Sequence, residues 1–200
     1  MKNENEHGIK KTPYNAMVLG VSAGGFRALS AVLPYLERTL PVPVFIVQHM
    51  SPTSDTYLVE HLQNICQVEV KLAEDKETPE QGVVYLAPPD YHLLIEADYS
   101  LALSLEDRVN YSRPSIDVLF ESAAQVYSDG LIGVIMTGGS TDGSKGLLEI
   151  KRYGGLTVVQ APETAEVDTM PESAIDSVEV DYIVPLDKLG VFLNMMLMGQ

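Results

Sequence analysis

The chain has 200 residues, 46% of them hydrophobic and 20% charged, so it is long enough to bury a core without disulfides or metal. Its formal net charge of -15 leaves no basic footprint for phosphates, which argues against nucleic acid and anionic membranes as partners. The single cysteine, Cys66, cannot form an internal disulfide, fits a reducing compartment and is expected to be a half-buried structural residue.

The N-terminal segment is polar and contains no apolar stretch typical of a secretory signal. No segment approaches the ~20 apolar residues that a membrane helix needs, so we expect no membrane insertion and a cytoplasmic protein. Residues 1–13 are expected to form a disordered tail and residues 14–200 a single domain.

Apolar runs alternate with helical patterns along most of the remaining chain. Buried strands are expected over residues 16–19, 42–47, 68–72, 131–136, 156–159 and 182–184. Helices are expected over residues 26–36, 57–65, 144–152, 171–176 and 186–197, and from Pro114 onward. This alternation predicts a parallel sheet with helices on both faces.

The middle of the chain has a different pattern. Residues 83–87, 92–96 and 101–105 are short apolar runs separated by turn residues, which predicts a small antiparallel meander. The expected fold class is therefore α/β: a doubly wound, mostly parallel sheet with helices on both faces and a small antiparallel β-hairpin or meander.

Residues with hydrolytic chemistry follow three of the expected strands. Ser22 follows the first, His49 the second, and Asp142 lies in the loop after residues 131–136. Loops at the carboxyl ends of parallel strands gather at one edge of the sheet. A serine nucleophile needs a base, and the base needs a carboxylate to orient it. We expect Ser22 Oγ to face His49 Nε2 and His49 Nδ1 to face Asp142.

The other histidines fit this role less well. One lies in the N-terminal tail, His61 is expected on the solvated face of a helix, and His92 opens a meander strand. Only His49 directly follows a buried parallel strand, although a lone histidine at a strand end is more often structural than catalytic. Its expected place beside Ser22 is therefore what favours a catalytic role for His49.

The segment 20–24 reads Gly-Val-Ser-Ala-Gly, which fits the G-x-S-x-G pattern of a turn that exposes a nucleophilic serine. A glycine-rich turn between strand and helix also opens nucleotide-binding domains, but the dinucleotide and P-loop fingerprints are absent. The order Ser, His, Asp differs from the Ser, Asp, His order of the α/β-hydrolases, so the pattern does not imply that family.

Taken together, these residues resemble the catalytic domain of the CheB-type protein-glutamate methylesterases of bacterial chemotaxis. The matching blocks, in the family's order, are GVSAGG (20–25), VQHM (47–50), YLAP (85–88), RPSIDVLF (113–120), TGGSTDG (137–143) and MPESAI (170–175).

The resemblance implies hydrolysis of glutamyl methyl esters on the cytoplasmic helices of methyl-accepting chemotaxis receptors, with deamidation of glutamine as a second activity and no cofactor. It implies a catalytic role for the serine, histidine and aspartate above. Backbone N–H groups near Ala23, Gly138 and Gly139 would hold the oxyanion. A separate receiver or methyltransferase protein is a further partner that the resemblance leaves open.

Three features depart from the family. Ala23 stands where the family usually has threonine, and Gly139 and Ser140 replace its Met-Gly pair. The chain has no room for the usual N-terminal receiver domain, so we expect a stand-alone catalytic domain. The alternative is a methylesterase-like module that binds receptor or partner with little catalysis.

Other polar residues are weaker candidates. Asp90, His92 and Arg113 are candidates for substrate binding, although turn capping and solvation explain them as well. Asp117 is expected on the surface of its helix rather than as a second catalytic carboxylate. No cluster has metal-ligand spacing, so no metal is expected.

Overall fold

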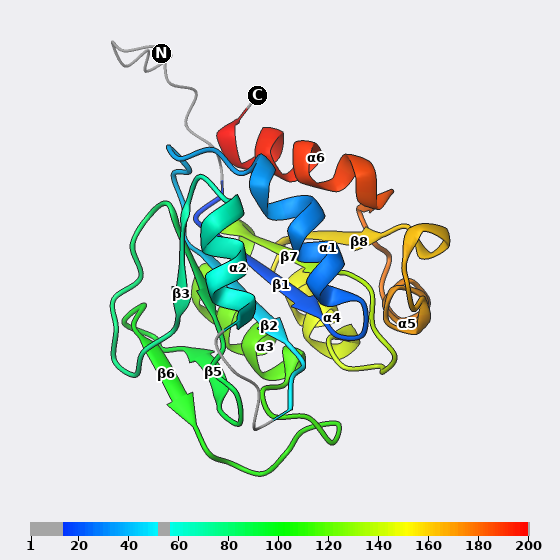
Figure 1. The fold of residues 1–200 in the computed structure, drawn as a ribbon. Helices are drawn as coiled ribbons and strands as arrows, with labels where there is room; N and C mark the ends of the chain where they lie inside the picture. The colour runs from blue at the N-terminus through cyan, green and yellow to red at the C-terminus, as the bar shows by residue number, and fades with distance from the viewer. Residues whose placement is uncertain (1–13, 52–56, 200) are drawn as a thin grey trace, which may run out of the picture.

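The computed structural model describes residues 14–51 and 57–199, and the expected tail over residues 1–13 lies outside them. A seven-stranded parallel sheet forms its centre, with strand order β3-β4-β2-β1-β7-β8-β9 (Figure 1). The strands are β1 Ala16–Val21, β2 Val44–Gln48, β3 Glu69–Leu72, β4 Val83–Leu86, β5 His92–Ile95, β6 Leu101–Ser104, β7 Leu131–Ile135, β8 Leu156–Gln160 and β9 Tyr182–Val184. The α-helices are α1 Gly25–Val32, α2 Tyr57–Ile65, α3 Ile116–Tyr127, α4 Ser144–Arg152, α5 Thr169–Ser177 and α6 Leu186–Met198.

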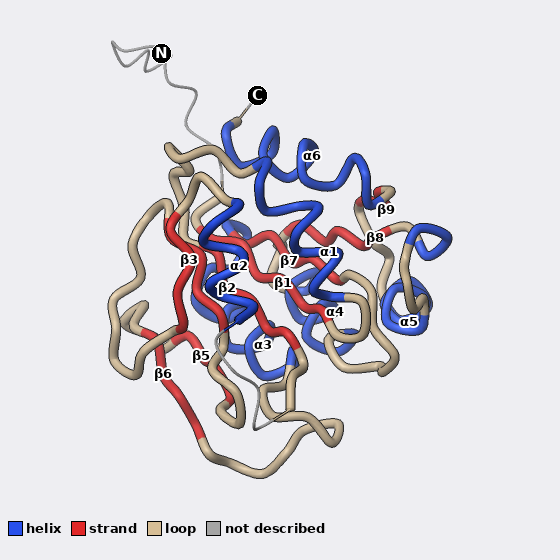
Figure 2. Tube along the Cα trace, in the orientation of Figure 1, coloured by secondary structure: helices blue, strands red, loops and turns tan. Residues whose placement is uncertain are grey.

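The sheet is covered on both faces, as the alternation of strands and helices predicts (Figure 2). Successive side chains of a strand point to opposite faces. Along β1, Met17 and Leu19 enter the core under α1, α2 and α6, whereas Ala16 and Val18 enter the core under α3, α4 and α5. The expected fold class is therefore confirmed, while the boundaries of a single domain over 14–200 stay a prediction.

One expected element is wrong. Residues 83–86 do not belong to an antiparallel meander: β4 lies in the main sheet, parallel to both β2 and β3. All residues of β4 are buried, which is typical of an interior strand of a parallel sheet. Of the three runs expected in the meander, β5 and β6 do pair antiparallel, as a separate hairpin that packs against α3.

The order of the strands creates a switch point at β1. From β1 the chain passes through α1 to β2 on one side, and later through α3 to β7 on the other. The connections leave opposite faces of the sheet, so a crevice opens beyond the carboxyl ends of these strands. The loops after β1, β2 and β7 meet there.

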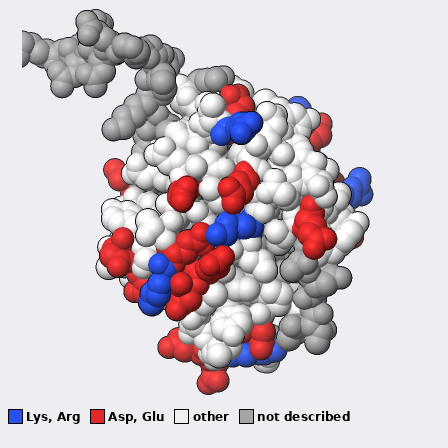
Figure 3. Space-filling view, turned by 60° about the vertical axis from the view of Figure 1, so that its left-hand side comes forward, with Lys and Arg blue, Asp and Glu red and all other residues white. Residues whose placement is uncertain are grey.

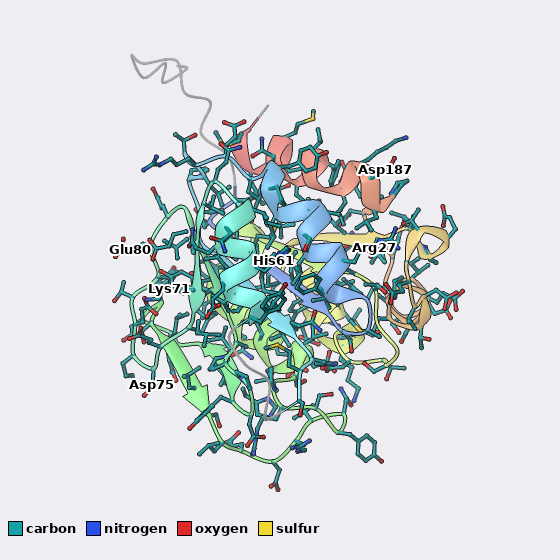
Figure 4. All side chains as sticks on the ribbon, viewed as in Figure 1. Arg27, His61, Lys71, Asp75, Glu80 and Asp187 are labelled. Carbon is teal, nitrogen blue, oxygen red and sulfur yellow. The ribbon has the colours of Figure 1, made fainter. Side chains whose placement is uncertain are left out.

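The surface reflects the acidic composition. Figure 3 shows a face on which Asp and Glu side chains gather toward the lower left, with Lys or Arg side chains beside them. Lys71, Asp75 and Glu80 lie at the same side of the molecule, far from Arg27 on α1 (Figure 4). None of the described helices combines the length and the apolar character that a membrane span needs.

Candidate active site

The turn after β1 presents Ser22 at the switch point. The Ser22 N–H donates to the Thr137 carbonyl (2.9 Å), which ties this turn to the loop after β7. Gly24 caps α1 in the left-handed region (φ 78°), and a Cβ there would press on Glu166 and Thr137. Glycine is therefore required for the chain to turn from Ser22 into the helix.

His49 lies between Ser22 and Asp142. Its backbone N–H donates to the carbonyl of Val21 (3.1 Å), which fixes the end of β2 beside β1. Its Nδ1 lies 3.2 Å from Ser22 Oγ, and its Nε2 lies 2.8 Å from Asp142 Oδ2. The structure brings these three residues together, but the two ring nitrogens face the opposite way from the sequence prediction. The neighbouring carboxylate keeps the proton on Nε2, so the lone pair of Nδ1 faces the hydroxyl.

Asp142, in the loop after β7, is 1% exposed, and its carboxylate faces the N-terminus of α3. Besides His49, it accepts hydrogen bonds from Asn110 Nδ2 (3.0 Å), Ser115 Oγ (2.8 Å) and the N–H groups of Ile116 (2.7 Å) and Asp117 (3.2 Å). Burial alone would raise the pKa of the carboxyl, but these hydrogen bonds outweigh it and lower the pKa to about 2. The carboxylate therefore stays ionised and can stabilise an imidazolium.

Asp117 is a second buried carboxylate, not the surface residue expected from the sequence; it is 2% exposed. It accepts hydrogen bonds from the N–H groups of Gly143 (2.9 Å) and Gly146 (2.8 Å) and from Asn110 Nδ2 (2.8 Å). Burial, together with the charge of Asp142, raises its pKa. It contacts neither His49 nor Ser22, so its bonds tie α4 and the loop that carries Asp142 to α3.

Gln48 clamps the nucleophile to the base. Its Nε2 donates to the carbonyls of Ser22 (2.9 Å) and His49 (2.9 Å). A Cβ at Gly25 would collide with its Oε1, so the glycine makes room for the clamp. Oε1 finds no hydrogen-bond partner among the described residues, because the amide is oriented with its Nε2 toward the two carbonyls.

The N–H groups expected to hold an oxyanion are not equivalent. The N–H of Gly138 donates to the Val167 carbonyl (2.9 Å), so it is unavailable and that expectation is corrected. Among the described residues, the N–H groups of Ala23 and Gly139 have no acceptor. A side chain at Gly138 would collide with Met170 Sδ, whereas a Cβ at Gly139 would meet only Val167 Cγ1, at 3.7 Å.

A cavity of about 460 Å³ opens beside Ser22 on the side of α1 and α2. Its wall is partly apolar, from Phe26, Met50 and Leu58, and partly charged, from Arg27 and Glu166. His61 is half-buried rather than solvated, because its ring stacks on Phe26 (4.6 Å) at this edge (Figure 4). The cavity can therefore accommodate apolar residues of a substrate next to the side chain that reaches Ser22.

The three candidate substrate-binding residues hold the loop between β6 and α3. His92 is 2% exposed; Nδ1 accepts from the Ser115 N–H (3.2 Å), so Nε2 donates to the Asp107 carbonyl (3.1 Å). Arg113 binds Asp90 Oδ1 (3.0 Å) and donates to backbone carbonyls of the same loop. His92 thus has a structural role, and substrate binding by Asp90 or Arg113 stays a prediction.

Sequence reasoning missed Asn110, Ser115 and Gln48 as parts of the site. Ser115 and Gln48 lie inside blocks that match the family, which was a usable signal; Asn110 lies outside every block. Cys66 is half-buried, as expected, and burial raises the pKa of its thiol to about 11. The described residues contain no group of three His, Cys, Asp or Glu that could hold a metal ion.

Comparison with known proteins identifies relatives of this chain. The family model for the CheB methylesterase matches residues 17–193. A protein of Leptospira interrogans, provisionally named a protein-glutamate methylesterase/protein-glutamine glutaminase, is 52% identical over 88% of this chain and 92% of its own length. The protein-glutamate methylesterase/protein-glutamine glutaminase of Thermotoga maritima is 38% identical over 86% of this chain, which spans 51% of that protein. The crystal structure of the Thermotoga maritima CheB methylesterase catalytic domain matches with a TM-score of 0.88 at 36% identity, over 92% of this chain and 98% of that one.

Proposed function

Because the chain belongs to the CheB methylesterase family, we propose that it hydrolyses glutamyl methyl esters on the cytoplasmic helices of chemotaxis receptors. The observation that carries the proposal is the line of contacts from Ser22 Oγ through His49 to Asp142. A separate receiver or methyltransferase protein as a further partner stays a prediction.

The geometry supports a serine esterase mechanism. Ser22 Oγ attacks the ester carbonyl carbon while His49 Nδ1 takes the hydroxyl proton. The imidazolium that forms keeps its Nε2–H on Asp142, whose ionised carboxylate stabilises the charge. The N–H groups of Ala23 and Gly139, which have no acceptor within the described part of the chain, are the donors available to the developing oxyanion.

Collapse of the tetrahedral intermediate breaks the bond to the methoxy group. His49 returns its proton to that oxygen, and methanol leaves an acyl-enzyme on Ser22. Water then attacks the acyl carbon while His49 takes its proton. The second tetrahedral intermediate breaks the bond to Ser22 Oγ, which receives the proton back from His49, and the glutamate carboxylate is released. With glutamine in place of the methyl ester the same steps release ammonia, which accounts for the second activity in the relatives' names.

Methanol release from a methylated receptor fragment tests the proposal. The Ser22→Ala variant is expected to release no methanol above background, because the attacking oxygen is gone. Ser30→Ala is the matched control: Ser30 lies on α1, bonds the Phe26 carbonyl and His61, and should leave the rate unchanged. Methanol release by folded Ser22→Ala at the wild-type rate would end the assignment.

A further inference from the structure

The loop between β6 and α3 ends in a strained two-residue turn. Val109 and Ser112 exchange backbone hydrogen bonds (3.1 and 2.8 Å), so Asn110 and Tyr111 are the central residues of the turn. Both have positive φ, 49° and 63°. Such turns favour Asn-Gly, since the second position suits glycine and is unfavourable for a bulky residue. A tyrosine here therefore needs an explanation.

The side chain of Tyr111 is not held by its own chain. It is 96% exposed and has no hydrogen bond, ion pair or ring contact with the described residues. Tyr99 offers a comparison: it also has positive φ (69°), but its ring packs edge-on against Tyr127 at 5.4 Å. Packing explains a tyrosine at 99, whereas nothing within the described part of the molecule explains one at 111.

The first central residue of the turn is anchored to the active site. Asn110 Nδ2 bonds both Asp142 (3.0 Å) and Asp117 (2.8 Å). Arg113 donates to the Leu105 and Glu106 carbonyls, which holds the start of the loop. Figure 1 shows this loop running below the carboxyl ends of β1 and β2. The backbone that carries the Tyr111 ring is thus held in place, because its neighbour Asn110 bonds the carboxylate of Asp142.

We propose that Tyr111 is a docking contact for the protein substrate, packing on the receptor surface next to the esterified glutamate that reaches Ser22. The proposal rests on the proposed function. Leu105 and Val109 of the same loop are also exposed, so the loop presents further apolar side chains to solvent. A rigid, exposed tyrosine loses little side-chain freedom on binding and commonly contributes strongly to an interface. Strained residues of this kind gather at functional sites.

The experiment compares Tyr111→Gly with wild type on two substrates, a methylated cytoplasmic receptor fragment and p-nitrophenyl acetate. Glycine removes the ring and relieves the strain, so the unfolding temperature should not fall. We expect KM for the fragment to rise about 10-fold and hydrolysis of the small ester to stay at the wild-type rate. Tyr111→Phe should keep KM close to wild type because the ring remains.

Tyr99→Gly is the matched control, since it relieves the same backbone strain at a tyrosine that packs internally. Its KM for the fragment should not change. An unchanged KM for Tyr111→Gly would overturn the docking role. So would an equal loss on both substrates, which would mean that residue 111 acts through Asn110 on Asp142. Ser22→Ala, measured alongside, tests the esterase proposal separately. If this variant still releases methanol, the esterase proposal is wrong, whatever the result for Tyr111→Gly.

Discussion

Gln48 offers a sharp test of how the site is held together, because it contacts both ends of the Ser22–His49 pair through their backbone. Gln48→Met keeps the shape of the side chain but removes the two N–H donors. The Ser22 carbonyl retains one donor, the Gly25 N–H at 2.9 Å, whereas no other donor to the His49 carbonyl is found among the described residues. In Gln48→Met the His49 carbonyl therefore loses its donor among the described residues, whereas the Ser22 carbonyl keeps one.

The expected cost follows from that difference. Losing the bond to Ser22 costs about 1 kcal/mol, and leaving the His49 carbonyl without a donor costs ~1–2 kcal/mol. A total of ~2–3 kcal/mol lowers the unfolding temperature of a chain of this size by about 5–10 °C. A displacement of the base by ~1 Å reduces turnover by about 100-fold, so we expect kcat to fall 10- to 100-fold with little change in KM.

Methanol release at saturating substrate measures kcat, and urea unfolding measures the stability. Gln48→Glu sharpens the result: its ionised carboxylate would face two carbonyls with no donor, so it should be less stable than Gln48→Met at pH 7. Protonation restores one O–H donor, so Gln48→Glu should recover relative to Gln48→Met as the pH falls. A folded Gln48→Met with wild-type kcat would refute the clamp.

Two further predictions concern the loop after β7 and its carboxylate. Gly138→Ala should lose ~1–3 kcal/mol of stability and most activity because its Cβ collides with Met170 Sδ, whereas Gly139→Ala should unfold at the wild-type temperature; equal losses in urea unfolding would contradict this. The pKa of Asp142 is lowered to about 2, so its ionised form stabilises the fold by ~2 kcal/mol above pH 4, and this is lost as the pH falls through about 2. The gap in unfolding free energy between wild type and Asp142→Asn should therefore shrink by that amount from pH 6 to pH 2; a constant gap would argue against it.

Local patterns were enough to predict most of the sheet and the three residues at its edge. The runs at β1, β2 and β7 are continuous and buried, so the rule that ligands gather at strand ends placed Ser22, His49 and Asp142 together. β4 was misassigned because a short apolar run has the same appearance in a hairpin and in a parallel sheet. Its place is decided by pairing with β2 and β3, which is not a local property.

The details of the site depend on contacts between distant segments. Asn110 lies outside every matched block, and its role arises only because the β6–α3 loop folds back onto Asp142. Asp117 was expected at the surface because a charged residue in a helix usually is; its burial depends on the N–H groups of Gly143 and Gly146. The orientation of the His49 ring likewise depends on how β2 ends beside β1, which no sequence pattern encodes.

The most direct test of the central claim is the site of reaction with a fluorophosphonate, which labels only an activated serine. Mass spectrometry of the labelled, folded protein should find one adduct, on the peptide that contains Ser22, and His49→Gln should abolish it because the base is gone. An adduct on another residue, or none on folded wild-type protein, would contradict the account; no labelling would favour a module that binds its partner without catalysis.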